Sequence, residues 1–247
     1  MKYTARDHAF VYGTIAKTAL SLYPDCKEAL IEGIKTYGRQ RGFRMAQTAS
    51  CFGDDLDMQH YLAYGEWSPQ PGEMDIEVPE VSPSAVWHVK RCPWKQEWAE
   101  KDMLDVGKIY CAYVDSELVR GFNPDLKLGT GKTQTAGDEY CYFKWVGADM
   151  SQQNLEENNR IKEKVGNVRL RKWSYHMAHI YKTMGECLQQ ALGADARARI
   201  YEEADKKLLE RYGKGCVDLM HAGLTIDYWI TPSLKPMHLL KELFSED

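Results

Sequence analysis

The chain has 247 residues, of which 44% are hydrophobic and 28% are charged, a balance typical of a globular protein with an ample core. Its net charge of −4 argues against nucleic acid as the main partner, because such proteins usually carry a basic surface. Residues 1–7 do not resemble a signal peptide, and no stretch stays apolar over the roughly eighteen residues that a membrane-spanning helix needs.

The N-terminal part of the chain is predicted to be helical. Apolar residues recur with helical spacing over residues 5–22 and 25–38, and a further helix is expected over residues 43–52. Between the last two segments, Arg39 and Arg41 alternate with glycines. This pattern fits either a solvated helix end or a clamp for a carboxylate, since arginine offers a planar fork of donors.

The middle of the chain combines short strands with one helix. Alternating or β-branched stretches predict strands over residues 74–78, 85–89, 126–130 and 140–145. Helical spacing predicts a central helix over residues 103–120, which Gly121 would end as its C-cap.

Residues after 150 are again predicted to be helical, with helices from about 151 and over 168–192, 196–212 and 234–244. The whole order predicts a helix-rich α+β fold, in which helices pack a small antiparallel sheet around a central helix. We expect residues 1–147 to carry the functional site. Residues 148–247 would form a helical region packed on that part in one compact unit.

Candidate catalytic residues lie on the central helix. Cys111 and Asp115 are four residues apart, so their side chains share one face. A carboxylate on this apolar face needs a partner or is held near neutrality for proton transfer. His88, on a neighbouring strand, is the nearest candidate base in sequence. Together the three residues would give a nucleophile, a base and an orienting acid.

Other uses of the same residue types stay open. A lone cysteine such as Cys111 is often an inert core residue, and Asp115 can be bonded to the backbone nearby. A zinc site is an alternative use of five side chains, namely His88, Cys92, Cys111, Asp115 and Cys141. Their spacing matches no standard zinc pattern, so we expect neither a metal nor another cofactor. His176 and His179 have a spacing that can bind metal, but they also fit a helix core.

Five sequence blocks, in the same order, resemble the L-2-amino-thiazoline-4-carboxylic acid hydrolase family. They are YGRQRG from residue 37, WHVKRCP from residue 87, YCAYVD from residue 110, RGFNP from residue 120 and GDEYCYF from residue 137. The resemblance implies hydrolytic opening of a small sulfur–nitrogen ring that bears a carboxylate. The closing GxxxCxF pattern also resembles the small-molecule-binding domains of the vinyl-reductase type, more loosely.

On this resemblance we expect a small-molecule substrate and no nucleic acid or membrane partner, while assembly into a homo-oligomer stays open. Residues expected to bind the substrate are Arg41, Arg91, Cys92, Asn123 and Cys141. An arginine would hold the carboxylate, and Asn123 would stabilise the developing anion.

Two other functions compete with this reading. One is hydrolysis of a cyclic ketone or amide, and the other is a non-enzymatic small-molecule sensor. Seven scattered cysteines without a CxxC pair predict reduced thiols and a cytoplasmic location.

Overall fold

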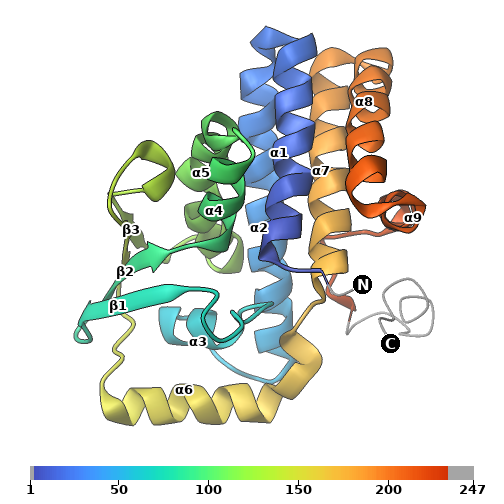
Figure 1. The fold of residues 1–247 in the computed structure, drawn as a ribbon. Helices are drawn as coiled ribbons and strands as arrows, with labels where there is room; N and C mark the ends of the chain where they lie inside the picture. Colours follow the sequence, from blue (N-terminus) through green and yellow to red (C-terminus); the bar gives the residue numbers. More distant parts are fainter. Residues whose placement is uncertain (1–2, 233–247) are drawn as a thin grey trace.

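The protein folds as a bundle of helices with a small sheet at one side, and its computed structural model describes residues 3–232 (Figure 1). Within that range the α-helices are α1 (Ala5–Leu22), α2 (Lys27–Cys51), α3 (Met58–Ala63), α4 (Pro93–Glu100), α5 (Leu104–Phe122), α6 (Gln152–Val165), α7 (Trp173–Leu192), α8 (Ala194–Tyr212) and α9 (Lys214–Ala222). Short 3₁₀ turns are η1 (Pro24–Cys26), η2 (Gln134–Ala136), η3 (Gly166–Arg169) and η4 (Gly223–Thr225).

The sheet is antiparallel, with the strand order β1-β2-β4-β3. Its strands are β1 (Asp75–Glu80), β2 (Ala85–Arg91), β3 (Leu128–Thr130) and β4 (Cys141–Trp145). In the central pair, Trp87 lies opposite Phe143 and Val89 lies opposite Cys141. This small antiparallel sheet among helices confirms the predicted α+β class.

The predicted break after residue 38 is wrong, because α2 runs unbroken from Lys27 to Cys51. Its glycines do not end the helix but let α5 approach it closely. A Cβ atom on Gly42 would lie 2.0 Å from the carbonyl oxygen of Leu118, so no larger residue fits there. Gly121 packs in the same way against the backbone of Arg39, and α5 continues past it to Phe122. The glycines that the sequence suggested as helix ends therefore form a helix–helix contact.

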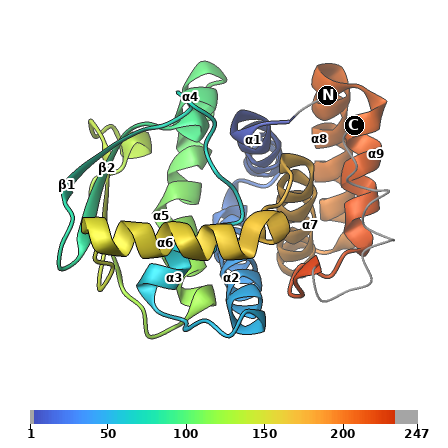
Figure 2. The same ribbon diagram turned by 90° about the horizontal axis from the view of Figure 1, so that it is seen from below.

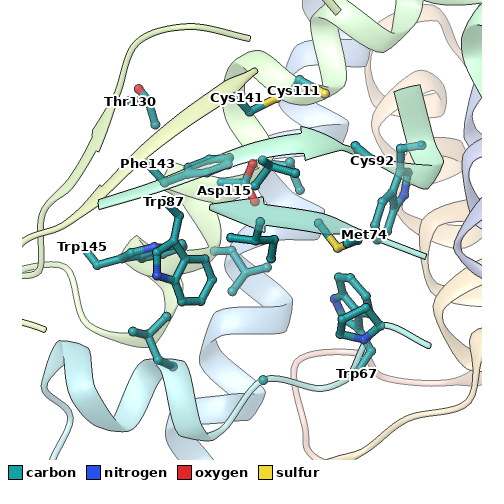
Figure 3. A pocket seen from close by; sticks show the side chains of 18 of the residues that line it. Trp67, Met74, Trp87, Cys92, Cys111, Asp115, Thr130, Cys141, Phe143 and Trp145 are labelled. Atoms are coloured by element: carbon teal, nitrogen blue, oxygen red, sulfur yellow. The ribbon is translucent and has the colours of Figure 1, made fainter. Parts of the chain in front are cut away.

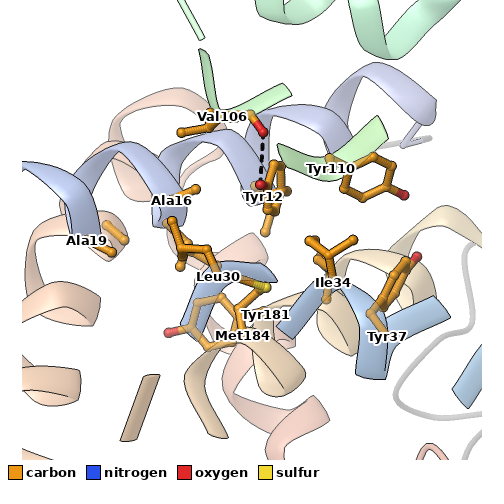
Figure 4. Close-up of a cluster of buried hydrophobic side chains, with 14 of the residues drawn as sticks. Tyr12, Ala16, Ala19, Leu30, Ile34, Tyr37, Val106, Tyr110, Tyr181 and Met184 are labelled. Carbon is orange, nitrogen blue, oxygen red and sulfur yellow. Dashed lines mark hydrogen bonds between the residues drawn. The ribbon is translucent and has the colours of Figure 1, made fainter. Parts of the chain in front are cut away.

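The main hydrophobic core lies where α1, α2, α5 and α7 meet (Figure 4). Tyr12, Ile34 and Met184 are fully buried there and come from three different helices. The Tyr12 hydroxyl donates a hydrogen bond to the carbonyl oxygen of Val106, at 2.9 Å. Because buried polar groups need such partners, this bond fixes α1 against α5.

The C-terminal helices share this core with the N-terminal ones. Helices α7 and α8 run beside α1, whereas α6 lies apart from them, below the sheet and α3 (Figures 1 and 2). Helix α6 is anchored through Asn158, whose Nδ2 donates to the carbonyl oxygen of Gln59 at 3.1 Å. Helix α7 starts at Trp173 rather than at residue 168, after a 3₁₀ turn. The helix predicted over residues 234–244 lies outside the described residues.

None of the helices in residues 3–232 is long and apolar enough to cross a membrane.

Candidate active site

A cavity of about 420 Å³ lies between the sheet and α5 (Figure 3). Loop residues and Lys162 of α6 also line it. Trp87 and Trp145 stand at one end of it, and Trp67 and Met74 stand at the other. Its size and largely apolar walls are those of a small-molecule site. The charged and thiol side chains that line it are Arg41, Cys92, Cys111, Asp115, Lys132, Cys141, Lys162 and Arg169.

The aromatic wall follows from strand geometry. Side chains along a strand alternate between its two faces, so Trp87 and Val89 share one face of β2. On β4 the same face carries Cys141, Phe143 and Trp145, and all five residues line the cavity.

Asp115 is the carboxylate of this cavity and lies near its middle (Figure 3). Within residues 3–232 its side chain makes neither a hydrogen bond nor an ion pair. Burial raises the pKa of Asp115 to about 6, and the charge of Arg41 only partly opposes that rise. A carboxylate with such a pKa can both accept and donate a proton near neutral pH.

Cys111 lies one helical turn before Asp115 and faces the same cavity, as the sequence predicted. Burial raises the pKa of its thiol well above the usual value, and neighbouring Cys92 adds to the rise. Burial likewise raises the pKa of Cys92 to about 12 and that of Cys141 above its ordinary value. All three groups are therefore thiols rather than thiolates near neutral pH, which makes them weak nucleophiles.

Arg41 reaches the cavity from α2 and is held from behind by a buried ion pair. Its Nε donates to Oε2 of Glu66 at 3.2 Å. Burial alone would lower the pKa of Arg41, but Tyr37 and Glu66 raise it above its ordinary value. The guanidinium group thus stays charged beside an apolar cavity, where it can bind a carboxylate.

A histidine also lies behind the cavity wall, but it is held neutral. His8 Nδ1 accepts a hydrogen bond from the indole N–H of Trp94 at 3.0 Å, so its proton is on Nε2, 2.9 Å from the Tyr37 hydroxyl. Burial lowers the pKa of His8 to about 3, and Arg41 contributes to the fall. His8 therefore fixes Trp94 and Tyr37 in place and is unsuited to act as a base.

The structure does not bring three of the predicted site residues into the cavity. His88 alternates to the opposite face of β2 from Trp87, where its ring stacks on Tyr140 with centroids 4.0 Å apart. Arg91 is exposed at the end of β2. Asn123 follows α5, and its Nδ2 donates to the carbonyl oxygen of Leu56 at 2.8 Å. The predicted contact between His88 and Cys111 is therefore absent, because strand alternation separates them.

The other predicted residues, Arg41, Cys92 and Cys141, do line the cavity with Cys111 and Asp115. Among the residues that the structure describes, no group of three or more His, Cys, Asp or Glu side chains is arranged to hold a metal ion. His176 and His179 are fully buried, and burial lowers the pKa of each well below its ordinary value. His179 Nε2 instead lies 2.7 Å from Oε1 of Gln40, a pairing inside the core. All seven cysteines are free.

Comparison with protein families finds a match that covers most of the cavity residues. The model of the L-2-amino-thiazoline-4-carboxylic acid hydrolase family matches residues 4–145, more than half of the chain. The chain belongs to this family. The match contains Arg41, Asp115 and the three cavity cysteines, and it ends at Trp145, the last residue of β4. Neither the curated proteins nor the solved structures provide a match.

Several cavity residues were missed from the sequence. The alternation of Trp87, Phe143 and Trp145 was a usable signal, since a period of two places them on one face. Trp67, Lys162 and Arg169 carried no such signal, because they reach the cavity from a loop, from α6 and from η3. Lys162 and Arg169 also lie beyond the part of the chain that the family model covers.

Proposed function

We propose that this protein hydrolyses a small ring that bears a carboxylate, as the family name indicates for L-2-amino-thiazoline-4-carboxylate, with Asp115 as the general base. The observation that carries the proposal is an unpaired, partly buried carboxylate that lines a largely apolar cavity together with Arg41. Paired carboxylates are common in protein structures. An unpaired one inside a ligand-sized cavity disfavours the folded state and is typical of sites of proton transfer.

In the proposed reaction, Arg41 binds the substrate carboxylate and thereby orients the ring. Ionised Asp115 accepts a proton from a water molecule, whose oxygen attacks the ring carbon bonded to nitrogen and sulfur. As the bond from this carbon to a ring heteroatom breaks, protonated Asp115 returns the proton to that heteroatom. The net reaction is the addition of one water molecule with opening of the ring, and it needs no oxidant or reductant.

This assignment gives water, rather than Cys111, the role of nucleophile. The raised pKa of the Cys111 thiol disfavours the thiolate, and the expected histidine base lies on the other face of the sheet. Cys111 would instead shape the cavity next to Asp115.

The test is the rate of ring opening by purified wild-type protein, the Asp115→Asn variant and a control. The control is Asp105→Asn, which removes a carboxylate from the first turn of the same helix, where Asp105 is paired with Lys17. We expect Asp115→Asn to lower kcat/KM for L-2-amino-thiazoline-4-carboxylate by about 10²–10⁴-fold, and Asp105→Asn to leave it unchanged.

The wild-type kcat/KM should also fall as pH drops below about 6, because protonated Asp115 cannot accept a proton. Wild-type activity in Asp115→Asn would overturn the role of Asp115. Absence of hydrolysis by the wild-type protein would overturn the choice of substrate.

A further inference from the structure

Lys162 and Arg169 line the cavity, and neither has an acidic partner among the described residues. Lys132 also lines the cavity without an ion pair, but its Nζ donates to the Tyr140 hydroxyl at 3.1 Å. The side-chain amine of Lys162, on α6, makes no hydrogen bond or ion pair with any residue in 3–232. Arg169, on η3, donates from Nη1 to the carbonyl oxygen of Gly65 at 2.6 Å, but its buried Nε has no partner in the described part of the chain. Both side chains are partly buried. A charge that is partly withdrawn from water and left without an ionic partner disfavours the folded state.

The neighbouring cations of the same helix are paired. Lys164 lies 2.7 Å from Oδ1 of Asp54, and Arg160 lies 3.1 Å from Oε2 of Glu157. The two sets of cations therefore differ in position: Lys162 and Arg169 line the cavity, whereas Lys164 and Arg160 do not. Burial lowers the pKa of both cavity residues, and the charge of Arg169 lowers that of Lys162 further. No carboxylate of the described chain opposes either shift, so both cations are available to pair with an anion from outside.

This pair comes from a different part of the chain than the proposed carboxylate-binding residue. Arg41 comes from α2 and is backed by Glu66, whereas Lys162 and Arg169 come from the segment after the sheet. A cavity of about 420 Å³ also leaves room beyond a single five-membered ring. We propose that Lys162 and Arg169 form a second anion-binding subsite, so that the substrate is a ring acid with a second acidic group.

This inference rests on the proposed function, because it assigns Arg41 to the first carboxylate. It also gives the segment after residue 145 a role in specificity. That segment lies outside the match to the family model, so the second acidic group would distinguish the substrate of this protein from one that has a single carboxylate.

The test compares the binding of benzoate, which has one carboxylate, with that of phthalate, isophthalate and terephthalate, which have two at different spacings. Dissociation constants would be measured by titration calorimetry with the full-length wild-type protein. We expect at least one dicarboxylate to bind at least about tenfold more tightly than benzoate, the gain of one charge-assisted contact. The double variant Lys162→Met/Arg169→Met should remove this preference while leaving the affinity for benzoate unchanged.

Two further variants make the result decisive. Lys162→Met alone leaves the contact of Arg169 with Gly65 intact, and it should reduce the preference even if the double variant folds poorly. Arg160→Met removes a solvent-facing charge from the same helix and should leave every affinity unchanged. The proposal is overturned if no dicarboxylate binds more tightly than benzoate, or if the preference survives in the Lys162→Met and double variants.

Arg41→Met separates this inference from the proposed function. It should weaken benzoate and the dicarboxylates together, because it removes the group that binds the shared carboxylate. If benzoate binding is unchanged in Arg41→Met but lost in the double variant, Arg41 is not the carboxylate-binding residue. That result would overturn the assignment of Arg41 and with it the division into two subsites.

Discussion

Glu66 is a buried acidic side chain and Asp115 is a partly buried one, and they differ in their partners. Glu66 accepts hydrogen bonds from Arg44 Nε and Nη2, each at 2.8 Å, and from Arg41 Nε at 3.2 Å. Asp115 has no hydrogen-bonding partner in residues 3–232. Burial raises the pKa of both groups, but the two guanidinium charges hold the pKa of Glu66 below its ordinary value, whereas that of Asp115 rises to about 6.

The difference separates a structural role from a chemical one. A carboxylate fixed by two arginines stays ionised and holds its neighbours in place, so Glu66 is suited to position Arg41. An unpaired carboxylate exchanges its proton easily and is suited to catalysis. Arg41 joins the two regions, since it contacts Glu66 and lines the cavity that contains Asp115.

Removing the charge of Glu66 should have the largest effect on stability. Glu66→Gln leaves two buried guanidinium groups without a counter-charge, so we expect the free energy of unfolding to fall by about 3–5 kcal/mol. Urea denaturation at pH 7.5 measures this, with Glu32→Gln as the control because Glu32 pairs with Arg39 at the surface. The control should change by less than about 1 kcal/mol. An equally small change in Glu66→Gln would show that the buried pair does not hold the fold.

Asp115→Asn should have the opposite effect on stability, although we expect it to lower activity. The pKa of Asp115 rises from its ordinary value to about 6, a shift that disfavours the ionised folded protein. Stability is therefore lost as pH rises from about 4 to about 6, and the loss is complete above that range. We expect Asp115→Asn to raise the free energy of unfolding by up to about 3 kcal/mol at pH 8 and to leave it unchanged near pH 3.

Denaturation of wild-type protein and Asp115→Asn at both pH values checks this expectation. Asp105→Asn serves as the control, since Asp105 is exposed. A variant that is less stable than wild type at pH 8 would show that Asp115 has a stabilising partner, and would contradict the contrast with Glu66.

Local spacing predicted which residues of α5 line the candidate site, whereas the position of the other residues depends on long-range packing. Cys111 and Asp115 share a helix face because of the helical repeat alone, and the sequence predicted this correctly. To place His88 correctly, one would need to know which face of β2 is turned towards α5. That depends on how the sheet packs and cannot be inferred from local spacing. Glu66 could not be paired with Arg44 from sequence, since the two residues are 22 positions apart and meet only in the folded protein.

The glycines of α2 show that long-range packing also limited how well the fold could be predicted from sequence. Glycines such as Gly38 and Gly42 are common at helix ends, so the sequence suggested that a helix stops there. Only the close approach of α5 shows why a continuous helix needs them. Lys162 was predicted to lie in a helical region, but its direction toward the cavity depends on how α6 packs under the sheet.

The smallest effect is expected from Cys111→Ser, which tests whether the unpaired carboxylate acts without a covalent partner. Burial holds the Cys111 thiol protonated, and the described chain places no histidine in the cavity, so we expect kcat/KM to stay within about tenfold of wild type. Cys51→Ser, at an exposed thiol, controls for the loss of a cysteine. A loss as large as that of Asp115→Asn, with a covalent adduct on Cys111 seen by mass spectrometry, would instead make the thiol the nucleophile. Asp115, one turn away, would then act on that thiol rather than on water.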